Sequence, residues 1–194
     1  GEAEMLAEYK LVWGSNEHFK KIDQIMESIS YNVIKSSSNL AVEKGIYPTF
    51  AGSKWSQGIM PHDHAPQAVN ALVDKDLFDA SYDWDVLREK VKKDGMRNGY
   101  LMAVAPTSSI SILVGTTQAI EPVYKRKWFE ENLSGLIPVV VPKLSPETWN
   151  YYTPAFEIDQ LQVIKAAAIR QKWIDQGQST NIFMSLDKAS GKYL

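Results

Sequence analysis

The sequence contains no cysteine, which excludes disulfides, thiolate metal sites and thiol catalysis within these residues. Neither sign of charge predominates, because 21 Lys and Arg against 23 Asp and Glu leave a formal net charge of -2. The basic surface typical of nucleic-acid binding is therefore not expected. No apolar run approaches the roughly 18 residues of a membrane span, and the N-terminus lacks the basic start and apolar core of a signal peptide. We expect a cytoplasmic protein that binds neither nucleic acid nor membrane.

The composition is that of an ordinary globular protein. The 194 residues are 44% hydrophobic and 23% charged, which suffices for one domain with its own core. The first residue is Gly and not Met, so we expect a processed chain or a piece cut from a longer one. We treat residues 1–194 as a single segment, without an obvious linker or repeat.

Two helices are predicted in the first half of the chain. Ser15 is a candidate N-cap for a long helix whose apolar residues recur every three to four positions and which ends at Gly45. Asp83 is a candidate N-cap for a second helix that ends at Gly95. Between them, residues 46–81 are rich in proline and glycine and predict loops with one short helix near "QAVNALVD".

Two further helices are predicted in the second half. Ser145, followed by Pro146 and Glu147, has the cap, the first-turn proline and the first-turn acid of a helix start. A longer helix is predicted over residues 158–176, with Gly177 as its stop and Leu161, Ile164, Ala168 and Ile169 on its inner side.

Short apolar runs predict strands at "GYLMAVA" (residues 99–105) and "STNIFMS" (residues 179–185). The run between them, "SISILVGTTQAI", fits a helix or a strand by its pattern alone. Strand, helix and strand in this order predict an α/β fold with parallel strands, in which ligands bind beyond the carboxyl ends of the strands.

A run of small hydroxyl residues follows the first predicted strand. Pro106 is succeeded by Thr107, Ser108, Ser109 and, after Ile110, a further serine. Hydroxyls and free backbone N–H groups at the start of a helix can hold an anion without Lys or Arg. The same residues are also what a simple helix cap requires, so the pattern leaves a cap and a phosphate site both open.

Other candidate clusters carry weaker signals. His62 and His64, with Asp63 between them, could be metal ligands if a further donor came from elsewhere, or they could lie in an exposed loop. The aromatic group at residues 149–152 is interpreted as packing, and "KRKWFEEN" as solvated surface with mixed charge. No serine–histidine–acid or nucleophile-elbow pattern is present.

Several longer motifs occur in an order that resembles one family. They are "NVIKSSSNLAVEKG", "WSQGIMP", "GMRNGYLMAVAPTSSISILVGTTQAIEP", "LSPETWNYYTPAF" and "RQKWIDQGQSTNIFM". Together they resemble the C-terminal part of the catalytic barrel of the class I ribonucleotide reductase large subunit. The resemblance runs from about Gly14 to Met184, and the ordered set is specific although no single motif is.

The resemblance implies an incomplete portion of a ten-stranded α/β barrel whose helices pack on parallel strands. In that family the proline and hydroxyl loop after a barrel strand holds the substrate diphosphate. This role carries over to Pro106, Thr107, Ser108, Ser109 and Ile110. The resemblance also implies an oxidoreductase that reduces ribonucleoside diphosphates for DNA synthesis by radical chemistry.

The family's thiyl cysteine, its redox cysteine pair and its radical-path tyrosines have no counterpart in this segment. We therefore expect the chain to be inactive alone, with no catalytic residue, metal or cofactor of its own. Its expected partners are a ribonucleoside diphosphate, the rest of the large subunit, a radical-generating metal small subunit and a second copy, with nucleotide effectors and a thiol reductant for the full enzyme. The alternative is a non-catalytic phospholigand-binding or assembly module.

Overall fold

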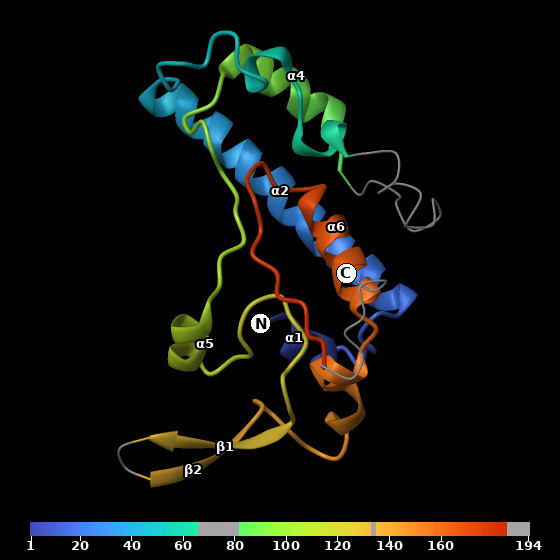
Figure 1. The fold of residues 1–194 in the computed structure, drawn as a ribbon. Coiled ribbons are helices and arrows are strands. Elements are labelled where there is room, and N and C mark those ends of the chain that lie inside the picture. The colour runs from blue at the N-terminus through green and yellow to red at the C-terminus, as the bar shows by residue number, and fades with distance from the viewer. Residues whose placement is uncertain (66–81, 133–134, 186–194) are drawn as a thin grey trace. The chain divides into compact units, whose positions relative to one another are not determined.

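The computed structural model describes residues 1–65, 82–132 and 135–185 (Figure 1). Helices dominate it, and the strands form one small sheet. In chain order the elements are α1 (Glu2–Glu8), α2 (Asn16–Lys44), η1 (Trp55–Gln57), η2 (Pro61–His64), α4 (Trp84–Asp94), α5 (Ser108–Val114), β1 (Lys127–Asn132), β2 (Gly135–Val140), η4 (Trp149–Tyr151), η5 (Ala155–Glu157) and α6 (Gln160–Gln171).

Both predicted helices of the first half are confirmed, because their caps are local in the sequence. The Ser15 hydroxyl accepts the His18 N–H at 3.1 Å, and α2 ends before Gly45, whose φ of 85° suits glycine. Asp83 accepts the Val86 N–H at 3.0 Å at the start of α4. The short helix predicted at "QAVNALVD" lies outside the described residues.

The long helix of the second half exists but is shorter than predicted. It runs from Gln160 to Gln171, because the residues after it turn away to make contacts that a helix would not allow. The Trp173 indole donates to Asp23 at 2.6 Å, and the Asp175 carboxylate accepts the N–H groups of Leu101 and Met102 at 2.9 and 2.7 Å.

Two details of the second-half predictions are wrong. Of the residues predicted on the inner side of α6, Ile169 is buried as predicted, whereas Leu161 and Ile164 are exposed. Val163 and Ala166 are buried in their place. Ser145 caps a turn and not a helix: its hydroxyl accepts the Thr148 N–H at 3.3 Å, and only the short η4 follows.

The two predicted strands are also wrong, since residues 99–105 and 179–185 are extended but form no ladder. They meet other segments only at single points, such as the parallel bridge between Val104 and Gln178. Side chains take the place of a neighbouring strand. Glu121 accepts the Asn181 N–H at 2.8 Å, and Gln160 accepts the Phe183 N–H at 2.8 Å, so alternate donors of this segment are bound by side-chain oxygens.

The sheet that does form was not expected. β1 and β2 pair antiparallel from Lys127 with Val140 to Asn132 with Gly135. The "KRKWFEEN" run, interpreted as solvated surface, is therefore largely a hairpin strand. Among the described residues the regular strands are thus antiparallel, and the predicted parallel α/β sheet is not what they form.

The chain divides into two compact units, which we describe separately. Unit 1 holds residues 1–18, 105–166 and the segment from Ser179 onward, and unit 2 holds residues 19–104 and 167–178. The buried cluster of unit 1 consists of Ala3, Ala7, Val123, Val141 and Tyr152. The core of unit 2 is larger and rich in aromatic residues: Ile34, Phe50, Trp55, Met60, Trp84, Leu87, Val91, Met96 and Trp173.

Two buried carboxylates of α2 organise unit 2. Glu27 accepts the Trp84 indole N–H at 2.9 Å, and Asp23 accepts that of Trp173 at 2.6 Å. Lys172 also reaches Asp23 at 3.2 Å. Burial raises the pKa of Asp23 and lowers that of Lys172, so each charge depends on the other. These bonds tie the start of α4 and the segment after α6 to the first half of α2 (Figure 1).

None of the described helices has the length and apolar character that crossing a membrane requires.

We predict that Asp83→Ala lowers the free energy of unfolding by about 1 kcal/mol, because the Val86 N–H loses its acceptor. Urea unfolding measures the change. The matched control is Glu89→Ala on the exposed face of the same helix, for which we expect a change within about 0.5 kcal/mol. Equal losses in both variants would contradict the cap assignment.

Candidate functional site

The hydroxyl run lies where an extended segment passes into helix α5. Pro106 is exposed, Thr107 is the residue before the helix, and Ser108, Ser109 and Ile110 form its first turn with exposed side chains. The N–H groups of a first helical turn have no carbonyl acceptor within the helix. The five residues predicted to contact a diphosphate are consecutive. The structure places their three hydroxyls and several N–H groups where the extended segment meets α5.

Thr107 does not cap the helix with its side chain, although it occupies the N-cap position. Its hydroxyl oxygen accepts the N–H of Ala119 at 2.9 Å, twelve positions further along the chain. The simple cap that the sequence pattern left open is therefore not formed by the Thr107 side chain. Ser111 is buried and donates to the Ser108 carbonyl at 2.7 Å, which stiffens the same turn from within.

The loop after α5 is held by helix α1. The Thr117 hydroxyl accepts the Glu4 N–H at 3.2 Å, and the Thr116 hydroxyl donates to the Glu4 carboxylate. The Ala119 carbonyl accepts the Glu2 N–H at 3.4 Å. Ala119 itself has a φ of 51°, in the left-handed region that residues with a side chain rarely adopt. Bonds on both sides of Ala119 thus hold an unfavourable conformation in place.

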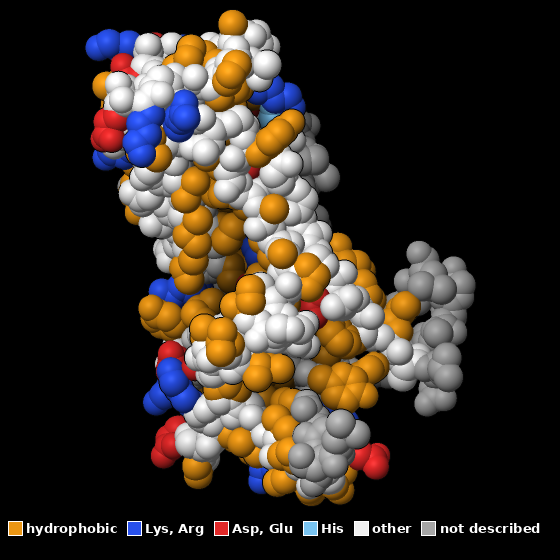
Figure 2. Space-filling model, turned by 90° about the vertical axis from the view of Figure 1, so that its left-hand side faces the viewer, with side chains coloured by type: hydrophobic (Ala, Val, Ile, Leu, Met, Phe, Trp, Pro, Cys, Tyr) orange, Lys and Arg blue, Asp and Glu red, His pale blue; other side chains and the backbone are white. Residues whose placement is uncertain are grey.

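The apolar side chains of α5 face outward. Ile112 and Leu113 are 80% and 85% exposed, and Ile110 and Val114 are also exposed. Hydrophobic side chains are likewise visible over much of the face in Figure 2. A short helix in water gains little from its own hydrogen bonds, so α5 depends on its anchoring by Thr107 and by the loop after it.

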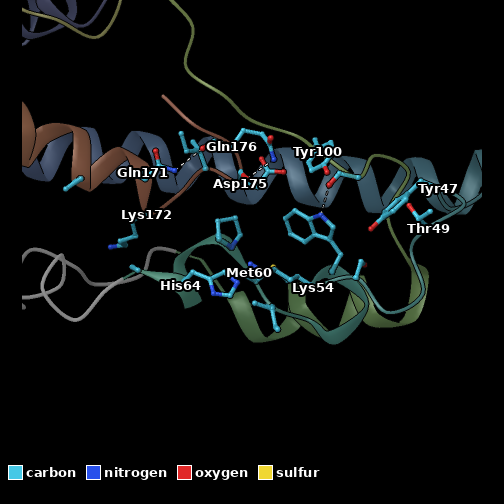
Figure 3. Close-up of a pocket in the computed structure, with 18 residues that line it drawn as sticks. Tyr47, Thr49, Lys54, Met60, His64, Tyr100, Gln171, Lys172, Asp175 and Gln176 are labelled. Carbon is cyan, nitrogen blue, oxygen red and sulfur yellow. Dashed lines mark hydrogen bonds between the residues drawn. The ribbon is translucent and has the colours of Figure 1, made fainter. Parts of the chain in front are cut away.

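A cavity of about 790 Å³ lies within unit 2 (Figure 3). Met60, His64 and Lys54 line one side of it, and the segment after α6 lines the other, with Gln176 labelled there. Aromatic and aliphatic side chains line it together with two glutamines, and Lys172 at its edge is already paired with Asp23. The cavity is thus a mixed apolar and polar groove, and the hydroxyl run does not contribute to it.

The two histidines considered as metal ligands have different surroundings. His62 packs edge-on against Trp84, with ring centroids 4.4 Å apart, and lies 5.3 Å from Trp173. His64 lines the cavity. Within residues 1–65, 82–132 and 135–185, no three histidine, aspartate or glutamate side chains are placed to share an ion. Burial lowers the pKa of His62, and this effect outweighs the attraction of Asp63.

The aromatic group at residues 149–152 serves packing, as predicted. Tyr152 is buried, and its hydroxyl donates to the Pro142 carbonyl at 2.7 Å. Burial, with Glu4 and Glu8 nearby, raises the pKa of Tyr152 to about 12. Trp149 lies under Arg126, whose guanidinium carbon is 5.0 Å from the ring centroid.

Sequence reasoning missed the residues that hold the extended segments. Asp175, Glu121 and Gln160 bind backbone N–H groups far away in the chain. A single acid or amide carries no local signal for such a role, because its partner is set by the tertiary fold.

The chain is similar to known proteins over its whole length. The family model for the ribonucleotide reductase barrel domain matches residues 1–194. The ribonucleoside-diphosphate reductase subunit alpha of Helicobacter pylori is 65% identical over 100% of this chain and 25% of its own length. The subunit alpha of Treponema pallidum is 40% identical over 96% of this chain and 21% of its own length. The ribonucleoside-diphosphate reductase large subunit of Danio rerio is 32% identical over 84% of this chain and 23% of its own length. The chain spans about a quarter of the length of these relatives.

We predict that stability falls as the pH drops below about 6.5, the ordinary pKa of an unfolded imidazole. The folded protein keeps His62 neutral, since burial lowers its pKa, so the unfolded chain takes up the proton first. The stabilisation is present above this pH and is lost as the pH falls through the lowered pKa. His62→Phe keeps an aromatic ring against Trp84 and should flatten this part of the profile.

Urea unfolding of both proteins between pH 7 and pH 5 measures the difference, and the imidazole signals measure the midpoint directly by NMR. A His62 midpoint at or above the ordinary value, or parallel profiles for the two proteins, would contradict the prediction.

Proposed function

The chain belongs to the ribonucleotide reductase barrel-domain family, and on that premise we propose that it is the segment of a ribonucleoside-diphosphate reductase large subunit that binds the substrate diphosphate. The contacts are assigned to Pro106, Thr107, Ser108, Ser109 and Ile110. In this proposal residues 1–194 are one portion of a ten-stranded α/β barrel.

The observation that carries the proposal is the position of the hydroxyl run. It starts α5 directly after an extended segment, and Ser108 and Ser109 are exposed where an anion could approach. Each hydroxyl can donate one hydrogen bond, and bonds to an anion are stronger than those between neutral groups. The run contains no Lys or Arg, so hydroxyls and backbone N–H groups would hold the diphosphate by hydrogen bonds.

The role of these residues is positioning. When one end of a substrate is anchored, its other end is presented to reacting groups in a fixed orientation, and this lowers the entropic part of the barrier. No bond of the substrate is broken by a hydroxyl of this loop. The chain has no cysteine, so the thiols of the reduction would come from elsewhere in the subunit.

Under this proposal the segment has no reductase activity by itself. Activity requires the rest of the large subunit, a radical-generating metal small subunit and a thiol reductant, with nucleotide effectors for control. We further propose a cytoplasmic location and a homo-oligomeric large subunit.

We predict that Ser109→Ala weakens the binding of pyrophosphate and of a ribonucleoside diphosphate roughly two- to tenfold, because one hydrogen bond to the anion is lost. Titration calorimetry on the 194-residue chain measures the affinity. The matched control is Ser36→Ala, an exposed serine of α2 in unit 2, for which the affinity should not change.

Equal affinities of Ser109→Ala and the unaltered chain would count against the diphosphate assignment. Mixing the chain with the flanking portions of the large subunit and with the small subunit tests the enzymatic part. Reductase activity that Ser109→Ala diminishes supports it. Binding of pyrophosphate without any activity on reconstitution would favour a phospholigand-binding module.

A further inference from the structure

We propose that Thr107 is a positioning residue for the diphosphate loop: its hydroxyl oxygen holds the Ala119 amide, and Ser108 and Ser109 make the side-chain contacts to the anion. This inference rests on the proposed function. It divides the five assigned residues into those that touch the ligand and one that fixes them.

The bond between Thr107 and Ala119 closes the loop that contains α5. The donor–acceptor distance of 2.9 Å is that of a well-formed N–H to oxygen bond. The Thr107 side chain is partly buried and makes no capping bond to its own helix, whereas the side chains of Ser108 and Ser109 are exposed. The Thr107 hydroxyl oxygen is thus directed into the loop, whereas the hydroxyls of Ser108 and Ser109 belong to exposed side chains.

The far end of this bond is itself held firmly. Ala119 has a φ of 51°, and its carbonyl accepts the Glu2 N–H. Two residues earlier, the buried Thr117 is bound by the Glu4 N–H at 3.2 Å. Because the loop end is anchored to α1, the Thr107 bond transmits that anchoring to the first turn of α5.

Fixing this turn from outside is needed, because α5 cannot fix itself. It has seven residues, and most of its apolar side chains are exposed, so it has little packing to hold its orientation. A site that contacts a ligand through short side chains requires those side chains to be held within about half an ångström. Thr107 supplies this restraint at the residue directly before Ser108.

The test compares Thr107→Val, which keeps the shape but removes the hydroxyl, with Thr107→Ser, which keeps the hydroxyl. Two quantities are measured on the 194-residue chain: the hydrogen-exchange rate of the Ala119 amide, and the affinity for pyrophosphate. In Thr107→Val we expect Ala119 exchange to accelerate about tenfold and pyrophosphate affinity to fall by about the same factor. Thr107→Ser should stay within about twofold of the unaltered chain in both measurements.

Two further variants separate positioning from contact. Ser109→Ala should weaken pyrophosphate binding and leave Ala119 exchange unchanged. Thr49→Val, an exposed threonine of unit 2, should change neither quantity. Unchanged exchange at the Asn181 amide, which Glu121 binds within unit 1, shows that this unit is folded in each variant.

Three results would overturn the inference. Unchanged Ala119 exchange in Thr107→Val would show that the bond does not hold the loop. Faster exchange with unaltered pyrophosphate affinity would show that the loop does not position the ligand. If Thr107→Ser changed Ala119 exchange and pyrophosphate affinity as much as Thr107→Val, the methyl group and not the hydroxyl would be responsible for both changes. If the unaltered chain binds no pyrophosphate, the proposed function fails for this chain and with it the positioning role, while Ala119 exchange still reports on the bond.

Discussion

Side chains satisfy the backbone N–H groups of the extended segments, and the fold within each unit depends on this. A buried donor must be paired, and in most proteins a neighbouring strand provides the acceptor. Here Asp175 accepts two such donors near the start of the hydroxyl run, and Glu121 and Gln160 accept two more near residue 182. Each segment is therefore held in place without belonging to a ladder.

The same principle shapes the candidate site at a smaller scale. Thr107 accepts the Ala119 N–H, and Glu4 binds the two threonines that precede Ala119 by two and three positions. The hydroxyl run is thus fixed through hydrogen bonds and not through an apolar core. Such a scaffold leaves the side chains of Ser108 and Ser109 exposed.

The sequence predicts a feature well when the residues that form it lie close together in the chain. The caps of α2 and α4 lie within three residues of the donors that they bind, so the sequence alone identifies Ser15 and Asp83 as helix starts. The position of the hydroxyl run before a helix was also local. The strands failed because Asp175 is more than seventy positions from the amides it binds. The early end of α6 has the same cause, as the Trp173 partner lies on α2.

The paired indoles of unit 2 have an optical consequence. Trp84 and Trp173 stack with centroids 5.5 Å apart and planes inclined by 20°, and each indole N–H is bound to its own carboxylate. Indoles held in fixed tertiary packing contribute a near-ultraviolet circular dichroism band that is lost when the packing is lost. That band reports on the joining of α4 and the segment after α6 to α2, so the assembly of unit 2 carries its own spectroscopic signature.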